Sequence, residues 1–181
     1  FIKLKDIKDY IYKDIEVYRS MFLLDDSIYD CKSVKEYKGI YGLDRLLFDF
    51  DYKKSGSKLI KEVLNFRSGL IDRNVDQKYI QIWFSGRGFH VVIPEYYGFK
   101  PSDNLPALVR ETIKRDFKGY DIDLIYDNAR IIRAEHTKNM KSDLYKIPIH
   151  YSYLETHNYE EVKALAILQN HPSYEIWKKD G

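Results

Sequence analysis

The run Leu-Leu-Phe-Asp-Phe-Asp at residues 46–51 decides how this chain can fold and where its chemistry can lie. Side chains alternate between the two faces of a strand, so Asp49 and Asp51 share one face while Phe48 and Phe50 occupy the other. Two neighbouring carboxylates disfavour each other's ionisation, and a divalent cation removes that conflict. Because Mg²⁺ is commonly held by one or two carboxylates together with substrate phosphates, the run predicts a metal-dependent nucleotide site at a strand end. The alternative is a strand end that runs into a solvated turn.

The composition describes a globular chain of one-domain size. The sequence has 181 residues, of which 44% are apolar and 32% charged, so it can bury a core. Its net charge of +2 is nearly balanced, and any nucleic-acid site must therefore come from local clustering of cations. Cys31 is the single cysteine, which excludes an internal disulfide and a zinc site built on cysteines.

The sequence carries no sign of a membrane segment or a secretory signal. No apolar run approaches the ~20 residues that a membrane span needs. We therefore expect an intracellular, cytoplasmic protein with no membrane partner. Because the chain begins abruptly at Phe1, we expect residues 1–181 to be a single domain within a longer protein.

Apolar spacing and turn residues predict the elements around the aspartate strand. Ile7, Ile11, Ile15 and Tyr18 recur at helical spacing and predict a helix over residues 5–19. The other predicted elements are a strand from Gly39 through the aspartate pair, a helix capped by Ser57, strands at 79–84 and 89–93 joined as a hairpin, a helix from Pro106 to Phe117, short strands at 121–126, 129–133 and 145–150, and a last helix capped by Asn158 and halted by Pro172.

The hairpin turn, Ser-Gly-Arg-Gly-Phe-His at residues 85–90, is the second stretch that indicates chemistry. Two glycines beside Arg87 let the backbone approach a ligand and expose amide donors, as in an anion cradle. Ser85 offers a hydroxyl, Arg87 a guanidinium fork that suits phosphate, and His90 a further donor. Hairpins also need glycine for purely steric reasons, which is the alternative.

A basic stretch at residues 130–142 is the third stretch that indicates chemistry. Five potential cations lie within it: Arg130, Arg133, His136, Lys138 and Lys141. A charge run is usually a solvated face, but the isoleucine pair at 131–132 indicates a packed strand that holds at least one guanidinium in place. Three upstream carboxylates could complete a metal site begun by the aspartate pair: Asp121, Asp123 and Asp127.

In this order, the three stretches resemble the archaeo-eukaryotic primase superfamily, and most of all its primase-polymerases from CRISPR loci, plasmids and phages. The resemblance covers roughly 100 residues, and the order of the motifs makes chance agreement unlikely. It implies an α+β fold over residues 1–181, a single primase-polymerase catalytic domain. This fold has an RRM-like, mostly antiparallel sheet, flanking helices and an additional αβ unit. The family commonly has Pro-Gly ahead of a loop hydroxyl, where this chain has Ala134-Glu135-His136.

The resemblance also implies an activity, nucleotidyl transfer that starts or extends strands on a single-stranded DNA template. Two ions, Mg²⁺ or Mn²⁺, would be held by Asp49, Asp51 and a third carboxylate. Asp123 is preferred over Asp121 as the third because the hydrophobic Ile122 precedes it. The implied nucleotide-binding residues are Ser85, Arg87, His90, Arg133 and Lys141, with Arg130, His136 and Lys138 as further candidates. The implied partners are the template, a primer strand, NTP or dNTP, and flanking domains or helicase and CRISPR proteins.

Other functions remain open at this point. A non-catalytic RRM-like module could bind single strands, although no pattern of aromatic residues on adjacent strands supports it. An end-joining type of gap-filling polymerase shares the same motifs. A histidine-rich metal hydrolase is less well supported, since the histidines at 90, 136, 150, 157 and 171 lack tight ligand spacing.

Overall fold

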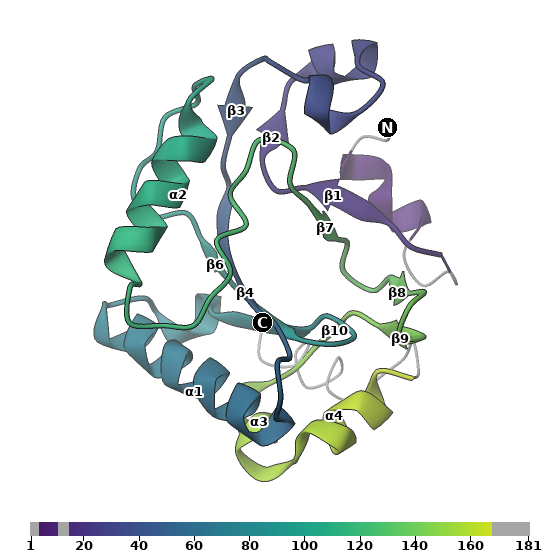
Figure 1. The fold of residues 1–181 in the computed structure, drawn as a ribbon, viewed down its shortest axis with the longest axis vertical. Coiled ribbons are helices and arrows are strands. Elements are labelled where there is room, and N and C mark those ends of the chain that lie inside the picture. The colour runs from purple at the N-terminus through teal and green to yellow at the C-terminus, as the bar shows by residue number, and fades with distance from the viewer. Residues whose placement is uncertain (1–3, 11–14, 168–181) are drawn as a thin grey trace.

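The computed structural model describes residues 4–10 and 15–167, which are built around a four-stranded antiparallel sheet (Figure 1). The strands lie in the order β10 (Ile147–Pro148), β5 (Gln81–Phe84), β6 (Phe89–Pro94) and β4 (Arg45–Phe50). Strands β5 and β6 form the predicted hairpin, and β6 also pairs along the whole of β4. The predicted α+β class is confirmed.

The helices pack on the face of the sheet that carries the phenylalanines of β4. They are α1 (Gly56–Asp72), α2 (Leu105–Asp116), α3 (Tyr151–Thr156) and α4 (Tyr159–Leu165). The Phe48 ring lies 4.6 Å from that of Phe66 on α1 and 4.8 Å from that of Phe117 after α2, measured between centroids. Since Phe48 and Phe50 are buried against the helices, the aspartates between and after them face the other way, as the alternation predicts.

Short strands form three further pairs outside the four-stranded sheet (Figure 1). They join β1 (Tyr18–Ser20) to β7 (Ile131–Arg133), β2 (Leu23–Leu24) to β3 (Tyr41–Gly42), and β8 (Lys138–Asn139) to β9 (Leu144–Tyr145). Short 3₁₀ helices occupy Leu4–Asp9, Asp26–Asp30, Val34–Glu36 and Gln77–Tyr79.

The predicted helix over residues 5–19 is wrong. A 3₁₀ turn ends at Asp9, Tyr18–Ser20 is strand β1, and residues 11–14 lie outside the described residues. Strand β1 is held by β7 and its neighbours: the Ala134 amide donates to the Val17 carbonyl at 2.8 Å. Pairing with a segment more than a hundred residues away overrides the helical spacing.

Several element boundaries also differ from the prediction. Ser55, rather than Ser57, caps α1, because its hydroxyl accepts the Lys58 amide at 3.3 Å. The strand expected from Gly39 is two strands, β3 and β4, and those expected at 129–133 and 145–150 are shorter. Helix α2 matches its prediction closely, and Asn158 caps α4 in a full capping box. Pro172 lies outside the described residues.

Residues 121–126 do not form the predicted strand. Asp123 alone bridges to β4, where its amide donates to the Asp49 carbonyl at 2.9 Å. The buried Tyr126 hydroxyl then substitutes for a strand partner: it donates to the Leu47 carbonyl at 2.8 Å and accepts the Leu47 amide at 2.9 Å. One amide and one side chain therefore close this edge of β4 next to the aspartates.

Tyr126→Phe is expected to destabilise the fold by about 1–3 kcal/mol, because a buried amide and a buried carbonyl of Leu47 lose their partner. Denaturant unfolding measures the change. The same substitution at the exposed Tyr79 is the control and should fall within about 0.5 kcal/mol of the native protein. Equal effects at the two positions would contradict the edge-closing role.

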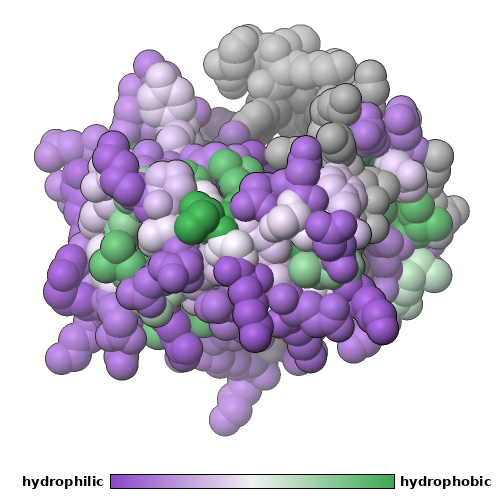
Figure 2. Space-filling view, turned by 90° about the horizontal axis from the view of Figure 1, so that it is seen from above, coloured by the Kyte–Doolittle hydropathy of each residue, from purple (hydrophilic) through white to green (hydrophobic). Residues whose placement is uncertain are grey.

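Within residues 4–10 and 15–167, no helix is long and apolar enough to cross a membrane. On the face shown in Figure 2, hydrophilic side chains predominate and apolar ones gather only in small patches.

Candidate active site

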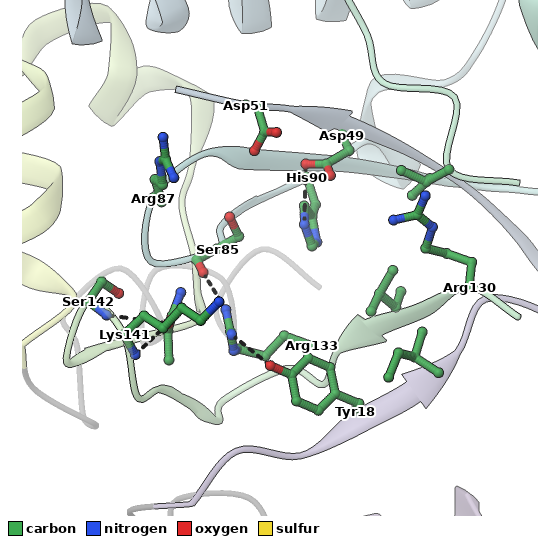
Figure 3. Close-up of a pocket in the computed structure, with 14 residues that line it drawn as sticks. Tyr18, Asp49, Asp51, Ser85, Arg87, His90, Arg130, Arg133, Lys141 and Ser142 are labelled. Carbon is green, nitrogen blue, oxygen red and sulfur yellow. Dashed lines mark hydrogen bonds and ion pairs between the residues drawn. The ribbon is translucent and has the colours of Figure 1, made fainter. Parts of the chain in front are cut away.

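A cleft of about 410 Å³ opens where β4 and the β5–β6 hairpin end (Figure 3). It is lined by predicted site residues from all three sequence stretches: Asp49, Asp51, Ser85, Arg87, His90, Arg130, Arg133 and Lys141. Figure 3 shows the aspartates on one side, at the end of β4, and Arg133 and Lys141 on the opposite side. The fold therefore brings an acidic wall and a basic wall together across one cavity.

The acidic wall concentrates negative charge. Burial, followed by the charges of Asp51 and Asp123, raises the pKa of Asp49 to about 7. Burial, then the charge of Asp51 and a hydrogen bond with it, also raises the pKa of Asp123. Three carboxylates are thus close enough to oppose one another's ionisation, and a cation between them would relieve that repulsion.

Asp123 and Asp121, the two alternatives for the third carboxylate, have different surroundings. Asp123 is tied to the main chain of Asp49 by the bridge described above. Asp121 is about half exposed and forms an ion pair with Lys53. The geometry therefore favours Asp123 as the partner of the aspartate pair.

The carboxylates fit a hard divalent cation. Within the described part of the chain, no three histidine, cysteine, aspartate or glutamate side chains converge closely enough to hold a metal ion by themselves. Carboxylate oxygens suit Mg²⁺ and Mn²⁺, and Mg²⁺ usually keeps several waters and substrate phosphate oxygens among its ligands. Asp49 and Asp51 are therefore suited to an ion whose remaining ligands come from a nucleotide and water.

His90 stands behind Asp49, directly across the β4–β6 pair. Its Nε2 lies 3.5 Å from the Asp49 carboxylate, and burial, then the charges of Lys146 and Arg133, place its pKa well below the usual value. The imidazole is therefore neutral at physiological pH. Its buried Nδ1 has no hydrogen-bond partner among the described residues, which leaves one polar atom available to a ligand or water.

Both glycines of the hairpin turn are required by the backbone. Gly86 has a φ of +92°, in the left-handed region. A Cβ on Gly88 would lie 2.2 Å from the carbonyl oxygen of Phe50. The Gly88 amide donates to the Ser85 hydroxyl at 3.2 Å, and the Tyr159 hydroxyl donates to the Arg87 carbonyl. The turn is thus pressed against the end of β4, which sets the distance between the hairpin and the aspartates.

Gly88→Ala is expected to destabilise the protein by about 1–3 kcal/mol and to displace the end of β4, because the new methyl group overlaps main-chain atoms that cannot move away. Thermal unfolding and nucleotide affinity, measured together, check both effects. Gly119→Ala is the control, since a Cβ there meets nothing within 4 Å. A Gly88→Ala protein with native stability and affinity would contradict the close approach.

Arg133 spans the basic wall. Its guanidinium donates to the Ser85 carbonyl at 3.1 Å, to the Glu16 carboxylate at 3.1 Å and to the Tyr18 hydroxyl at 3.2 Å (Figure 3). Lys141 lies on the turn that follows, where its backbone amide donates to the side-chain oxygen of Asn139 at 3.0 Å. The isoleucines between the arginines do belong to a packed strand, β7, as the sequence indicates.

Three predicted residues do not line the cleft: Asp123, which lies beside it on the bridge to Asp49, and His136 and Lys138. His136 has a φ of +59° and is packed edge-on against Trp83, with ring centroids 5.3 Å apart. Lys138 forms an ion pair with Asp143 at 2.7 Å. Neither His136 nor Lys138 lines the cavity, so the structure does not support a nucleotide contact from either.

Three polar lining residues were missed by sequence reasoning: Tyr18, Asn139 and Ser142. Tyr18 carried no signal because its segment resembled a helix. Asn139 and Ser142 did carry a detectable sequence signal. Asparagine favours turns in which its side chain accepts the amides of residues that follow it, as the Asn139 side chain does here.

Comparison with solved structures finds a similar fold in the polymerase domain of ligase D from Mycobacterium tuberculosis, in complex with DNA. The match has a TM-score of 0.50 and 16% sequence identity, and it covers 82% of this chain and 58% of that one. This chain shares the fold of that polymerase domain. No protein-family model and no curated protein sequence matches the chain.

Proposed function

We propose that this chain is a template-dependent primase-polymerase that transfers a nucleotide from NTP or dNTP to a 3′-hydroxyl on a single-stranded DNA template. The observation that carries the proposal is the arrangement of the cleft, in which Asp49 and Asp51 face Arg133 and Lys141 across one cavity, with Asp123 bridged to Asp49 beside it. Phosphoryl transfer needs this combination, because acidic ligands hold the metal ions and basic groups hold the phosphates. The fold shared with a polymerase domain supports it.

Asp49, Asp51 and Asp123 would hold two ions, Mg²⁺ or Mn²⁺. When bound, such ions lower the pKa of an attacking hydroxyl and neutralise charge on the triphosphate and the leaving pyrophosphate. The protein contributes the carboxylates, whose neighbouring charges, after burial, raise the pKa of Asp49, and a bound cation would relieve this cost.

The basic wall would hold the triphosphate still. Arg133 and Lys141 supply cations, Ser85 a hydroxyl, and Arg87 and Arg130 further guanidinium groups at the two ends of the cleft (Figure 3). Fixing the phosphates in line with the attacking hydroxyl is positioning rather than acid–base chemistry. His90, which is neutral and lies 3.5 Å from Asp49, carries a single N–H, and it would donate this either to a phosphate from Nδ1 or to that carboxylate from Nε2, not to both.

A gap-filling polymerase is the second candidate function. The fold match to the polymerase domain of a ligase, solved with DNA, favours it. Such an enzyme would use the same cleft but would need a primer end. The CRISPR, plasmid or phage setting, the helicase partners and the flanking domains remain predictions from the sequence motifs.

Incubation of the purified protein with labelled NTP or dNTP and Mn²⁺ tests both candidates on three templates: an unprimed single strand, a primed strand and a gapped duplex. Labelled products on the unprimed strand support the primase-polymerase. Products on the primed or gapped DNA alone support the gap-filling enzyme. Template binding without products on any of them would contradict catalysis and leave a binding module, and EDTA in place of Mn²⁺ is the control.

A further inference from the structure

Lys146 is a buried cation to which the proposed reaction gives no role. It lies between β9 and β10, and its side chain is fully buried. Its Nζ donates to the Arg133 carbonyl at 2.9 Å and lies 3.5 Å from the Glu135 carboxylate. The Trp83 ring covers it, with the Nζ 5.7 Å from the ring centroid. Burying a charged ammonium group costs free energy, so the burial of Lys146 needs an explanation.

The segment that follows β7 is folded around this lysine. The Lys146 amide donates to the Thr137 carbonyl at 2.9 Å, and the Lys146 carbonyl accepts the His136 amide at 3.0 Å. Together with the bond from its Nζ to Arg133, three hydrogen bonds from one residue fix residues 133–137. Nothing else described here reaches the Arg133 carbonyl from a side chain.

The charge of Lys146 is balanced locally. Burial opposes the ionisation of Glu135, yet the charges of Lys146 and Arg19 hold its pKa below the usual value. Burial lowers the pKa of Lys146 to about 8, so the ammonium group is still mostly charged at neutral pH. The pair is therefore a buried ammonium group and a carboxylate, and the ammonium group also donates to the Arg133 carbonyl.

Arg133 links this pair to the cleft, because its carbonyl accepts the Lys146 Nζ and its guanidinium forms the basic wall. We propose that Lys146, held by Glu135, is a positioning residue of the triphosphate site: it fixes the main chain of Arg133 and thereby keeps the guanidinium aimed into the cleft. The proposal rests on the proposed function, since it assigns Arg133 a phosphate. The competing explanation is a buried ion pair that stabilises the fold and nothing more.

Two double variants separate these explanations, and neither leaves Lys146 or Glu135 as an unpaired buried charge. Lys146→Gln with Glu135→Gln keeps an N–H donor for the Arg133 carbonyl, whereas Lys146→Met with Glu135→Gln removes it. Affinity for tripolyphosphate with Mn²⁺ is measured for each by calorimetry, together with the melting temperature. We expect the methionine variant to bind about tenfold more weakly than the native protein and the glutamine variant to stay within about threefold.

A cycle with Arg133→Ala completes the test. If Lys146 acts through Arg133, adding the methionine double variant to Arg133→Ala weakens binding no further, whereas independent effects add. Lys163→Met, on the surface of α4, is the matched control and should leave binding unchanged.

Equal affinities for the two double variants, or additive effects with Arg133→Ala, would overturn the positioning role while leaving the proposed function standing. A native protein that binds neither tripolyphosphate nor a nucleotide with Mn²⁺ would overturn both. Melting temperatures identify a variant that has lost its fold. If the methionine double variant is unfolded, the glutamine double variant decides between the two explanations: weak binding by a folded glutamine variant counts against the proposal.

Discussion

Asp49→Asn and Asp51→Asn are each expected to lower the rate of nucleotide transfer by at least about 10³-fold while the fold stays intact. The amide has nearly the shape of the carboxylate but carries no charge, so a metal ligand is lost without leaving a cavity. Loss of about 4 kcal/mol of transition-state stabilisation corresponds to this factor. The initial rate of labelled-nucleotide incorporation on a primed template, with Mn²⁺, measures it.

The two candidate third carboxylates provide the matched comparison. Asp123→Asn should lose activity to the same extent as Asp49→Asn and Asp51→Asn, because Asp123 adjoins both aspartates. Asp121→Asn should retain more than half of it, since Asp121 is engaged with Lys53 at the surface. The reverse order would mean that Asp121 is the ligand, and full activity in Asp49→Asn would contradict metal-dependent transfer at this site.

In the absence of metal, Asp49 is expected to make the native protein less stable as the pH rises. Its pKa is 3.8 in the unfolded chain and about 7 in the folded one. The folded state therefore binds more protons between these values, and stability falls with rising pH across that window. At pH 8 the ionised Asp49 costs up to about 4 kcal/mol, so Asp49→Asn should be the more stable protein there.

Denaturant unfolding in EDTA from pH 4 to pH 8 measures this difference. The advantage of Asp49→Asn should be near zero at pH 4 and largest above pH 7, and Mn²⁺ should stabilise the native protein but not the variant. Asp103→Asn, at an exposed aspartate before α2, is the control and should track the native protein. A constant offset between Asp49→Asn and native across the pH range would contradict the buried, repelled carboxylate.

Elements with local signals could be predicted from the sequence. The β5–β6 hairpin was marked by its glycine turn, α2 by Pro106 in its first turn and α4 by the cap at Asn158. Each of these signals depends on neighbours in the chain, so no knowledge of the tertiary structure is needed.

Elements that depend on distant partners could not be predicted from the sequence. Tyr18–Ser20 becomes a strand only because β7 lies beside it. Residues 121–126 stay irregular because a single backbone amide, that of Asp123, and the Tyr126 side chain complete the edge of β4. Spacing within the chain gives no information about either partner.

The same distinction holds for the site. Asp49, Asp51, Ser85 and Arg133 were predicted because each belongs to a short motif. The positions of His136 and Lys138 depend on a turn with a positive φ and on Asp143, which the sequence did not reveal. The burial of Lys146 was not predicted, because it depends on the fold rather than on neighbours in the sequence.

The central claim is that Asp49, Asp51 and Asp123 jointly hold divalent cations that bind a nucleoside triphosphate. The most direct test is the anomalous scattering of crystals grown with Mn²⁺ and a non-hydrolysable nucleoside triphosphate. We predict manganese within ~2.5 Å of the carboxylate oxygens of Asp49 and Asp51, with the phosphates directed toward Arg133 and Lys141. Nucleotide bound with no manganese peak at these carboxylates, or bound away from this cleft, would contradict the claim.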